Sequence, residues 1–175
     1  FCMREIDELR LISVAEVKET LGCTLLKGES KELERMIRRP KIAAMNLEHL
    51  LERLEESDLV IGPGDRVEII LGVLAANYAK AFPSISALLL TGGLLPPSNF
   101  LRLIEGIDFL NIPILSIDSD TYRSALAIDG IAATFRPEHK RKIALAMGEF
   151  MNAIDTELLQ ERIRTIHSDI ITPSM

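Results

Sequence analysis

The stretch Ile85-Ser86-Ala87-Leu88-Leu89-Leu90-Thr91-Gly92-Gly93 decides the fold class of this chain of 175 residues. Residues 85–90 form a continuous apolar run, which is typical of a strand covered on both faces in a parallel sheet. The threonine and the two glycines that follow favour a turn. We therefore predict a central strand here, inside a sheet that carries helices on both sides.

Strands and helices alternate along the chain on both sides of this central strand. Further strands are predicted at residues 23–26, 41–45, 58–61 and 112–117, with a short sixth strand at 132–134. Helices are predicted over residues 13–22, 46–56, 66–82, 100–107, 120–130 and 137–166. Such alternation with short turns indicates parallel strands joined by right-handed crossovers. The predicted fold is α/β, a three-layer α/β/α sandwich around a largely parallel sheet of five or six strands.

Several of these helices carry capping signals. Ser13 and Glu16 have the spacing of a capping box, in which the serine hydroxyl accepts from the amide of Glu16 and the glutamate accepts from the serine amide. Asn46 is the expected cap of the second helix, and Asp65 is suited to cap the apolar helix over residues 66–82. Gly22 fits the left-handed position that ends the first helix.

Composition and charge exclude several classes of protein. The formal charge of −6 argues against a nucleic-acid-binding protein, because phosphate contacts need a basic face. The short basic run over residues 35–41 is flanked by acids and is interpreted as solvated surface. No apolar run is long enough for a membrane span or has the flanks of a signal peptide. Cys2 and Cys23 have no metal or redox spacing, which favours a reducing, cytoplasmic location.

The two ends of the sequence indicate a piece of a longer protein. The chain begins with Phe1 rather than methionine and stops shortly after a Thr-Pro-Ser sequence. We expect residues 1–12 to be a linker, residues 13–166 to form one domain, and residues 167–175 to lead toward a further domain.

Three loops are expected to meet at one edge of the sheet, because the carboxyl ends of parallel strands lie together and ligands bind there. They contain Gly64-Asp65-Arg66, Thr91-Gly92-Gly93 and Asp118-Ser119-Asp120. Arg66 and the amides near Gly64 and Gly92 could contact an anionic ligand at the start of the following helix. The alternative is that Asp65 caps that helix and the glycines only make tight turns.

The sequence offers no clear catalytic or cofactor site. It contains neither a third glycine after Gly62 and Gly64 for a dinucleotide fingerprint nor a phosphate-binding loop with a following lysine. Asp65, Asp118 and Asp120 could bind Mg²⁺ and support a hydrolase, but aspartates after strands more often cap helices. The three histidines are far apart in the sequence and form no zinc or triad pattern. We expect no cofactor, no resident metal and no catalytic residues.

The helix over residues 66–82 is apolar around nearly its whole circumference, which indicates burial on more than one side. In a small domain a second copy of the chain is one source of that cover. Burial under the long helix over residues 137–166 is the alternative.

Asp65-Arg66 and Thr91-Gly92-Gly93 together spell the signature of the DRTGG domain family, and the chain resembles that family over residues 13–166. The apolar context from Ser86 and the Ile-Pro-Ile-Leu-Ser sequence from Ile112 also resemble it. The likeness is strongest to the DRTGG domain in the middle of long bacterial phosphotransacetylases.

The resemblance implies a fold like that of the N-terminal domain of HPr kinase. It also implies a position between a dethiobiotin-synthetase-like domain and an acetyltransferase domain, whose active site would lie beyond Met175. The expected function is then non-catalytic: regulation by a metabolite such as pyruvate, phosphoenolpyruvate or NADH, together with homo-oligomerisation. The alternative is a purely structural dimerisation module that binds no small molecule.

Overall fold

The computed structural model describes residues 6–107, 111–135, 137, 139–153 and 160, and it divides into two compact units. The larger unit comprises Leu11–Thr134. The other contains a short 3-10 helix, η1 (Asp7–Arg10), and helix α7 (Lys140–Ala153). The remainder of the long helix predicted over residues 137–166 falls mainly outside the described residues. The predicted domain boundaries at 13 and 166 stay a prediction.

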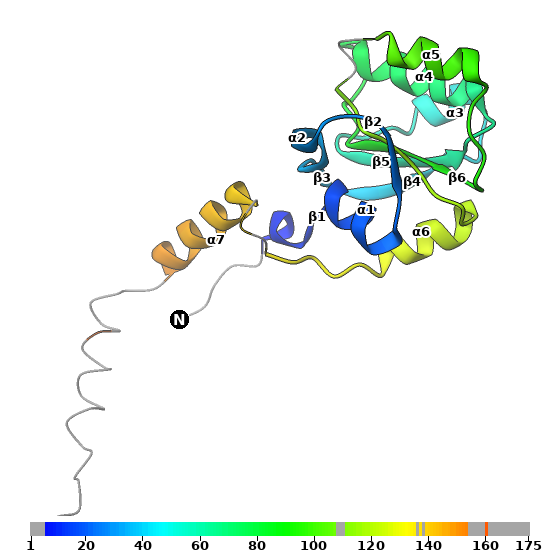
Figure 1. Cartoon of the computed structure of the whole chain (residues 1–175). Coiled ribbons are helices and arrows are strands. Elements are labelled where there is room, and N and C mark those ends of the chain that lie inside the picture. The colour runs from blue at the N-terminus through cyan, green and yellow to red at the C-terminus, as the bar shows by residue number, and fades with distance from the viewer. Residues whose placement is uncertain (1–5, 108–110, 136, 138, 154–159, 161–175) are drawn as a thin grey trace, which may run out of the picture. The chain divides into compact units, whose positions relative to one another are not determined.

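A five-stranded sheet in the order β2-β7-β6-β5-β4 forms the centre of the larger unit (Figure 1). The strands β4 (Arg39–Ile42), β5 (Asp58–Pro63), β6 (Ala87–Thr91) and β7 (Ile114–Ser116) are parallel. The edge strand β2 (Thr24–Lys27) runs antiparallel to β7. The prediction of a largely parallel five-stranded sheet is confirmed, and β6 occupies its centre as the apolar run indicated.

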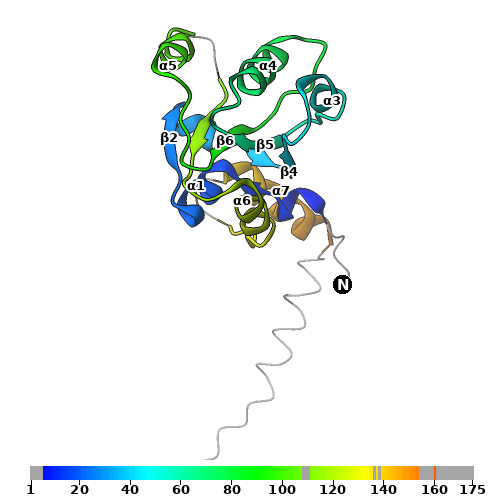
Figure 2. The ribbon, with the colours of Figure 1, turned by 90° about the vertical axis from the view of Figure 1, so that its right-hand side faces the viewer.

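Helices cover both faces of this sheet (Figure 2). One face carries α3 (Leu47–Leu51), α4 (Val67–Tyr78) and α5 (Ser98–Glu105), and the other carries α1 (Val14–Leu21) and α6 (Thr121–Asp129). Alternate residues of the strands point to opposite layers. Leu88 and Leu90 therefore belong to the core under α4, whereas Leu89 belongs to the core under α1 and α6. The three-layer sandwich is confirmed.

Several short elements differ from the sequence predictions. A two-stranded antiparallel sheet of β1 (Ile12–Ser13) and β3 (Met36–Ile37), together with the single-turn helix α2 (Ser30–Leu33), was not predicted. The strand predicted at 132–134 is wrong, because this segment belongs to no strand and the amide of Thr134 donates to the Glu16 carboxylate instead. Among the described residues, no helix has the length and apolar character needed to cross a membrane.

Glu16 joins the start of α1 to the end of the larger unit. Its carboxylate accepts from the amide of Ser13 at 2.7 Å and from the hydroxyl of Ser13 at 3.0 Å, which completes the predicted capping box. It also accepts from the amide of Thr134 at 3.1 Å and from the Thr134 hydroxyl. Glu16 is only 2 % exposed, and four donors on one buried carboxylate explain why it is stable in the charged form.

We expect Glu16 to make the free energy of unfolding depend on acid pH. Burial raises the pKa of Glu16, but the hydrogen bonds from Thr134 and Ser13 outweigh burial, so the pKa lies below its ordinary value of 4.5. Because the folded-state pKa is the lower one, this stabilisation is complete above the unfolded pKa and is lost as pH falls through the folded pKa. Glu16→Gln should flatten the acid branch of stability measured by urea unfolding. An acid branch equally steep in the variant would contradict this assignment.

Candidate functional site at the carboxyl edge of the sheet

Backbone hydrogen bonds join the loops that leave the carboxyl ends of β5, β6 and β7. The amide of Gly64 donates to the carbonyl of Thr91 at 3.3 Å. The amide of Gly92 donates to the carbonyl of Ser119 at 2.8 Å, and that of Gly93 donates to the carbonyl of Ile117 at 3.0 Å. The three loops therefore meet as the sequence predicted, and they form one hydrogen-bonded unit. The glycine amides that we considered as anion contacts already have carbonyl partners.

Substitution of two glycines of this unit is expected to strain the loops. A Cβ atom on Gly64 would lie 1.7 Å from the carbonyl oxygen of Leu94, which is backbone and has little freedom to move. Gly93 has a φ of +65°, in the left-handed region, and a Cβ there would lie 3.2 Å from a carboxylate oxygen of Asp118. The geometry of the turn thus depends on the close approach of Gly64 to the backbone of Leu94.

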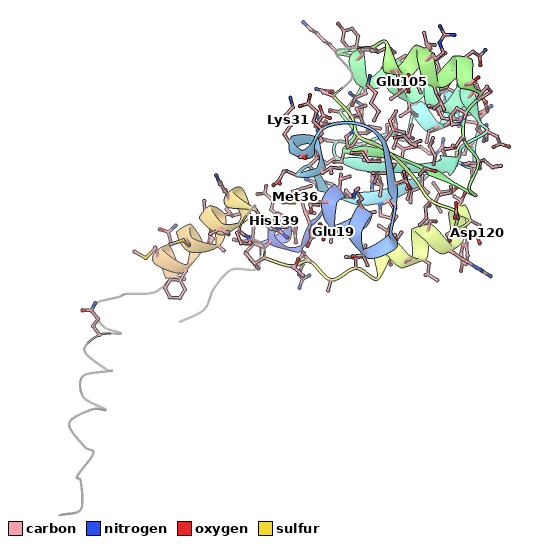
Figure 3. All side chains as sticks on the ribbon, in the orientation of Figure 1. Glu19, Lys31, Met36, Glu105, Asp120 and His139 are labelled. Atoms are coloured by element: carbon pink, nitrogen blue, oxygen red, sulfur yellow. The ribbon has the colours of Figure 1, made fainter. Side chains whose placement is uncertain are left out.

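Thr91 fixes the end of β6 to the start of α6. The Thr91 side chain faces the α6 layer, and its Oγ1 lies 2.7 Å from the Oγ1 of Thr121. Thr91 is 1 % exposed, so its hydroxyl has little access to water. Asp120, labelled in Figure 3, caps α6 by accepting from the amide of Arg123 at 2.9 Å. The signature threonine therefore positions the loop before α6.

A double-mutant cycle on this hydroxyl pair is expected to show coupling of about 1 kcal/mol. Thr91→Val removes one hydroxyl and leaves the other without its partner, whereas adding Thr121→Val removes both. The second substitution should therefore cost less in the Thr91→Val background than in the original chain. Urea unfolding of the four proteins measures the coupling, and strictly additive losses would show that the two hydroxyls do not interact.

Arg66 spans the gap between α4 and the loop after β4. Its Nη1 donates to the carbonyl oxygens of Ala43 at 3.4 Å and Met45 at 3.2 Å, and its Nε donates to Glu68 at 2.8 Å. The side chain remains 31 % exposed. Arg66 is also the N-cap residue of α4, so the prediction that Asp65 caps this helix is wrong. The helix begins one residue later, and its first turn has no side-chain cap.

The exposed charges at this edge are mostly acidic. Asp65 and Asp118 are both exposed, and no hydrogen bond or ion pair to another described residue engages either carboxylate. Asp120 is paired with Arg123 at 3.3 Å. An anionic ligand would therefore depend on Arg66 rather than on a general positive potential. Within the described residues no group of His, Cys, Asp and Glu side chains is arranged to hold a metal ion.

Sequence reasoning missed four partners of the predicted site residues. The Ala43 and Met45 carbonyls belong to a loop after a different strand, and no side-chain pattern marks them. Thr121 lies one residue after the predicted cap Asp120, and only the topology shows that it faces Thr91. Glu68 could have been found, because it follows Arg66 by two residues and has the opposite charge.

A cavity of about 20 Å³ lies between β2, the end of β6 and α5. This volume holds about one water molecule and no metabolite. Lys27 lines it and donates from Nζ to the carbonyls of Ile104 at 2.7 Å and Ile107 at 3.0 Å. The lysine therefore caps the carboxyl end of α5, and the cavity is a packing defect rather than a binding site.

The parallel sheet, its helical layers and the interlocked loops define the class of protein. It is a three-layer α/β domain in which the loops at the carboxyl edge of the sheet are joined by backbone and side-chain hydrogen bonds. The chain belongs to the DRTGG domain family, whose model matches residues 16–131. Of the five residues that the sequence analysis assigned to the signature of that family, Arg66, Thr91, Gly92 and Gly93 make hydrogen bonds between the loops, whereas the Asp65 side chain does not.

Relatives of the chain are much longer proteins. The chain is 40 % identical over 175 residues to the phosphate acetyltransferase of Nitratidesulfovibrio vulgaris, which covers all of this chain and 25 % of that protein. It is 31 % identical over 168 residues to the phosphate acetyltransferase of a Synechocystis strain, covering 95 % of this chain and 24 % of that protein. The chain thus spans about a quarter of the length of the curated relatives it matches.

A solved structure confirms the fold class. The CBS and DRTGG domains of the regulatory region of Clostridium perfringens pyrophosphatase, complexed with the activator diadenosine tetraphosphate, align with a TM-score of 0.53. The likeness covers 71 % of this chain and 51 % of that one at 22 % identity. At this identity the comparison establishes the shared fold.

Proposed function

We propose that this chain is the regulatory domain of a cytoplasmic phosphate acetyltransferase and has no catalytic residues of its own. Its membership of the DRTGG family and its likeness to one quarter of several phosphate acetyltransferases support this proposal. Acetyl transfer would take place in another domain of the same chain. A dethiobiotin-synthetase-like domain and the acetyltransferase domain would be its neighbours, and the whole protein would assemble as a homo-oligomer.

The regulatory signal would be an anionic metabolite that contacts Arg66. This part of the proposal rests on the position of Arg66, which links the start of α4 to the Ala43 and Met45 carbonyls while 31 % of its side chain stays exposed. A carboxylate or phosphate that replaced Glu68 as partner would compete for the same guanidinium. Binding would then loosen or reorient the loop after β4, and the hydrogen bonds through Gly64 would carry the change to the other loops.

A second candidate function is a purely structural module. The hydrogen bonds within the chain favour it. The amides of Gly64, Gly92 and Gly93 already donate to backbone carbonyls. Arg66 already has three hydrogen-bond partners. In that case the signature residues would only fix the loops, and the domain would serve dimerisation without binding a small molecule.

A thermal-shift panel separates these two functions. The panel contains pyruvate, phosphoenolpyruvate, NADH, adenine nucleotides, acetyl-CoA and acetyl phosphate. An effector at about 100 times its Kd should stabilise the chain by roughly 2.7 kcal/mol, which is about 5–10 °C for a domain of this size. The effector proposal expects one compound to produce such a shift, and a flat panel would support the structural module.

Arg66→Ala should abolish the shift, because the guanidinium is the proposed contact. Arg66→Lys keeps the charge but loses the planar fork, so it should retain only part of the response. Arg102→Ala is the matched control, since Arg102 is an exposed arginine on α5. An effector response that is unchanged in Arg66→Ala would contradict the proposed contact.

A further inference from the structure

The larger unit ends in a short segment, residues 131–134, which we call the strap. The strap follows α6 and has neither helix nor strand structure. Ile131 and Ala133 are half-buried and pack against the core under α1 and α6, whereas Ala132 and Thr134 are exposed. So few buried contacts indicate low local stability, as in segments that open while the rest of a domain stays folded.

The carboxylate of Glu16 holds the far end of the strap to α1. It accepts from the amide of Thr134 at 3.1 Å and from the Thr134 hydroxyl, and it also accepts from the amide and hydroxyl of Ser13. Thr134 is the last residue of the larger unit, and Ser13 lies close to its first residue, Leu11. One buried side chain therefore joins the points at which the chain enters and leaves this unit (Figure 1).

Ser13 is in turn connected to the start of the central strand β6. It pairs with Met36 in the small two-stranded sheet. The carbonyl of Met36, a residue labelled in Figure 3, accepts from the hydroxyl of Ser86 at 2.5 Å. Ser86 directly precedes β6, and its amide donates to the carbonyl of Asp58 at 2.8 Å. The side chain that holds the strap is thus fixed to the amino end of β6.

Helix α6 is attached to β6 at both of its ends. At the carboxyl edge of the sheet, the Oγ1 atoms of Thr91 and Thr121 join the end of β6 to the start of α6. At the other end, the amide of Ile131 donates to the carbonyl of Ile128 at 3.1 Å, and the connection to β6 then runs through the strap and Glu16. The 9 residues of α6 form a rod of about 13 Å, so a displacement of its start is passed on to the strap.

We propose that the strap is a releasable element, held by Glu16, through which a change in the Asp65-Arg66 and Thr91-Gly92-Gly93 loops reaches the chain beyond Thr134. The inference rests on the proposed regulatory function and adds an output route at the amino edge of the sheet. A ligand that reorients the loops would shift the start of α6, and α6 would then move Thr134 away from Glu16. The strap yields before β6 does, because β6 is buried throughout.

Native-state amide hydrogen exchange of the chain, followed by NMR, tests whether Glu16 holds the strap. The Thr134 amide should be protected in the original chain. Glu16→Gln should accelerate its exchange at least about 10-fold, the factor expected for loss of a hydrogen bond to a charged group. Glutamine has only one oxygen for the donors of Ser13 and Thr134, so its amide group must face one set of them. The amides of β6 should keep their protection, as local release requires.

Glu32→Gln is the matched control for this substitution. Glu32 is 9 % exposed and accepts from the amide of Glu29 at 2.7 Å in the capping box of α2, and within the described residues no hydrogen bond joins it to the strap. Its replacement should leave Thr134 exchange unchanged. A Thr134 amide that is unprotected in the original chain, or equally protected in Glu16→Gln, would overturn the proposal. If Glu16→Gln does not fold, Thr134→Val decides in the same way, because it removes only the strap hydroxyl.

Thr91→Val tests the connection along α6 without any ligand. Loss of the Thr91 hydroxyl loosens the start of α6, so the Thr134 amide beyond its other end should exchange at least about 5-fold faster, the lower end of usual coupling between sites. Ser124→Ala is the control on the same helix, because the Ser124 hydroxyl is buried and has no hydrogen-bond partner among the described residues. Unchanged Thr134 exchange in Thr91→Val, or equal acceleration in Ser124→Ala, would contradict the route through α6.

The phosphate acetyltransferase that would contain this chain allows binding to be separated from response. With Glu16→Gln the chain should keep its thermal shift with the effector, because Arg66 is intact, whereas the enzyme should run at one rate with or without that compound. A rate response unchanged by Glu16→Gln would overturn the strap as the output route. An original enzyme that responds to no compound would instead reject the effector proposal, and the exchange measurements, which need no ligand, would still decide whether Glu16 and α6 control the strap.

Discussion

Gly64→Ala is expected to lower the free energy of unfolding by about 3 kcal/mol, at the upper end of the usual cost of overpacking. The added Cβ would lie 1.7 Å from the backbone oxygen of Leu94, so a loop must move rather than a side chain. The movement also separates the Gly64 amide from the Thr91 carbonyl, which are 3.3 Å apart. Urea unfolding measures this loss, and an unchanged m-value would show that the unfolded state is unaffected.

Gly130→Ala is the matched control for this prediction. A Cβ at Gly130 would lie 3.6 Å from the nearest atom, the carbonyl oxygen of Ala127, and the residue has an ordinary right-handed φ of −82°. Its replacement should leave stability unchanged or raise it by up to about 1 kcal/mol. If Gly64→Ala is as mild as Gly130→Ala, the loops at the carboxyl edge are not locked together as described.

Asp58→Ala is expected to cost about 2–3 kcal/mol, because it leaves two cations and a backbone amide without their shared partner. Asp58 is fully buried at the start of β5. It accepts from Nε of Arg39 at 3.0 Å and from the amide of Glu55 at 2.9 Å, and Nζ of Lys41 lies 3.8 Å away. The Arg39 side chain is 40 % exposed, so water recovers part of the loss.

Glu55→Gln is the control, because Glu55 pairs with the same arginine from an exposed position. Its side chain is 58 % exposed, and an exposed ion pair contributes at most about 0.5–1 kcal/mol. Thermal and urea unfolding should therefore separate the two variants clearly. Equal losses in both would mean that burial of Asp58 adds nothing to its ion pair.

The fold was largely predictable because its decisive signals are local. A run of apolar residues buried on both faces identified β6, and the spacing of Ser13 and Glu16 identified the start of α1. The second partner of Glu16, Thr134, lies 118 residues away, and no local pattern reveals such a contact. The direction of β2 was equally hidden, because its partner β7 is distant in sequence. Strands as short as β1 and β3 have no period to detect.

The position of the candidate site was predictable, but which of its hydrogen-bond donors already have partners within the chain was not. Parallel topology brings the Asp65-Arg66 and Thr91-Gly92-Gly93 loops to one edge, and the structure confirms this meeting. Whether a backbone amide or the Arg66 side chain is free to bind a ligand depends on how the loops approach one another, and the residue sequence does not show this. The glycine amides are engaged by carbonyls, and Arg66 reaches the Ala43 and Met45 carbonyls at the end of a neighbouring strand. Whether the predicted residues contact a ligand stays a prediction.

The central proposal is that this domain regulates acetyl transfer without carrying it out. The most direct test is the initial rate of acetyl transfer from acetyl-CoA to phosphate by the phosphate acetyltransferase that would contain this chain, measured across the metabolite panel. The intact enzyme is compared with its Arg66→Ala variant and with a form that lacks residues 11–134.

We expect both altered enzymes to keep acetyl transfer and to lose the response to the effector, with Arg102→Ala responding like the intact enzyme. The isolated chain should show no acetyl transfer. Loss of turnover in a shortened enzyme that still assembles, or an effector response unchanged by removal of residues 11–134, would contradict the regulatory role.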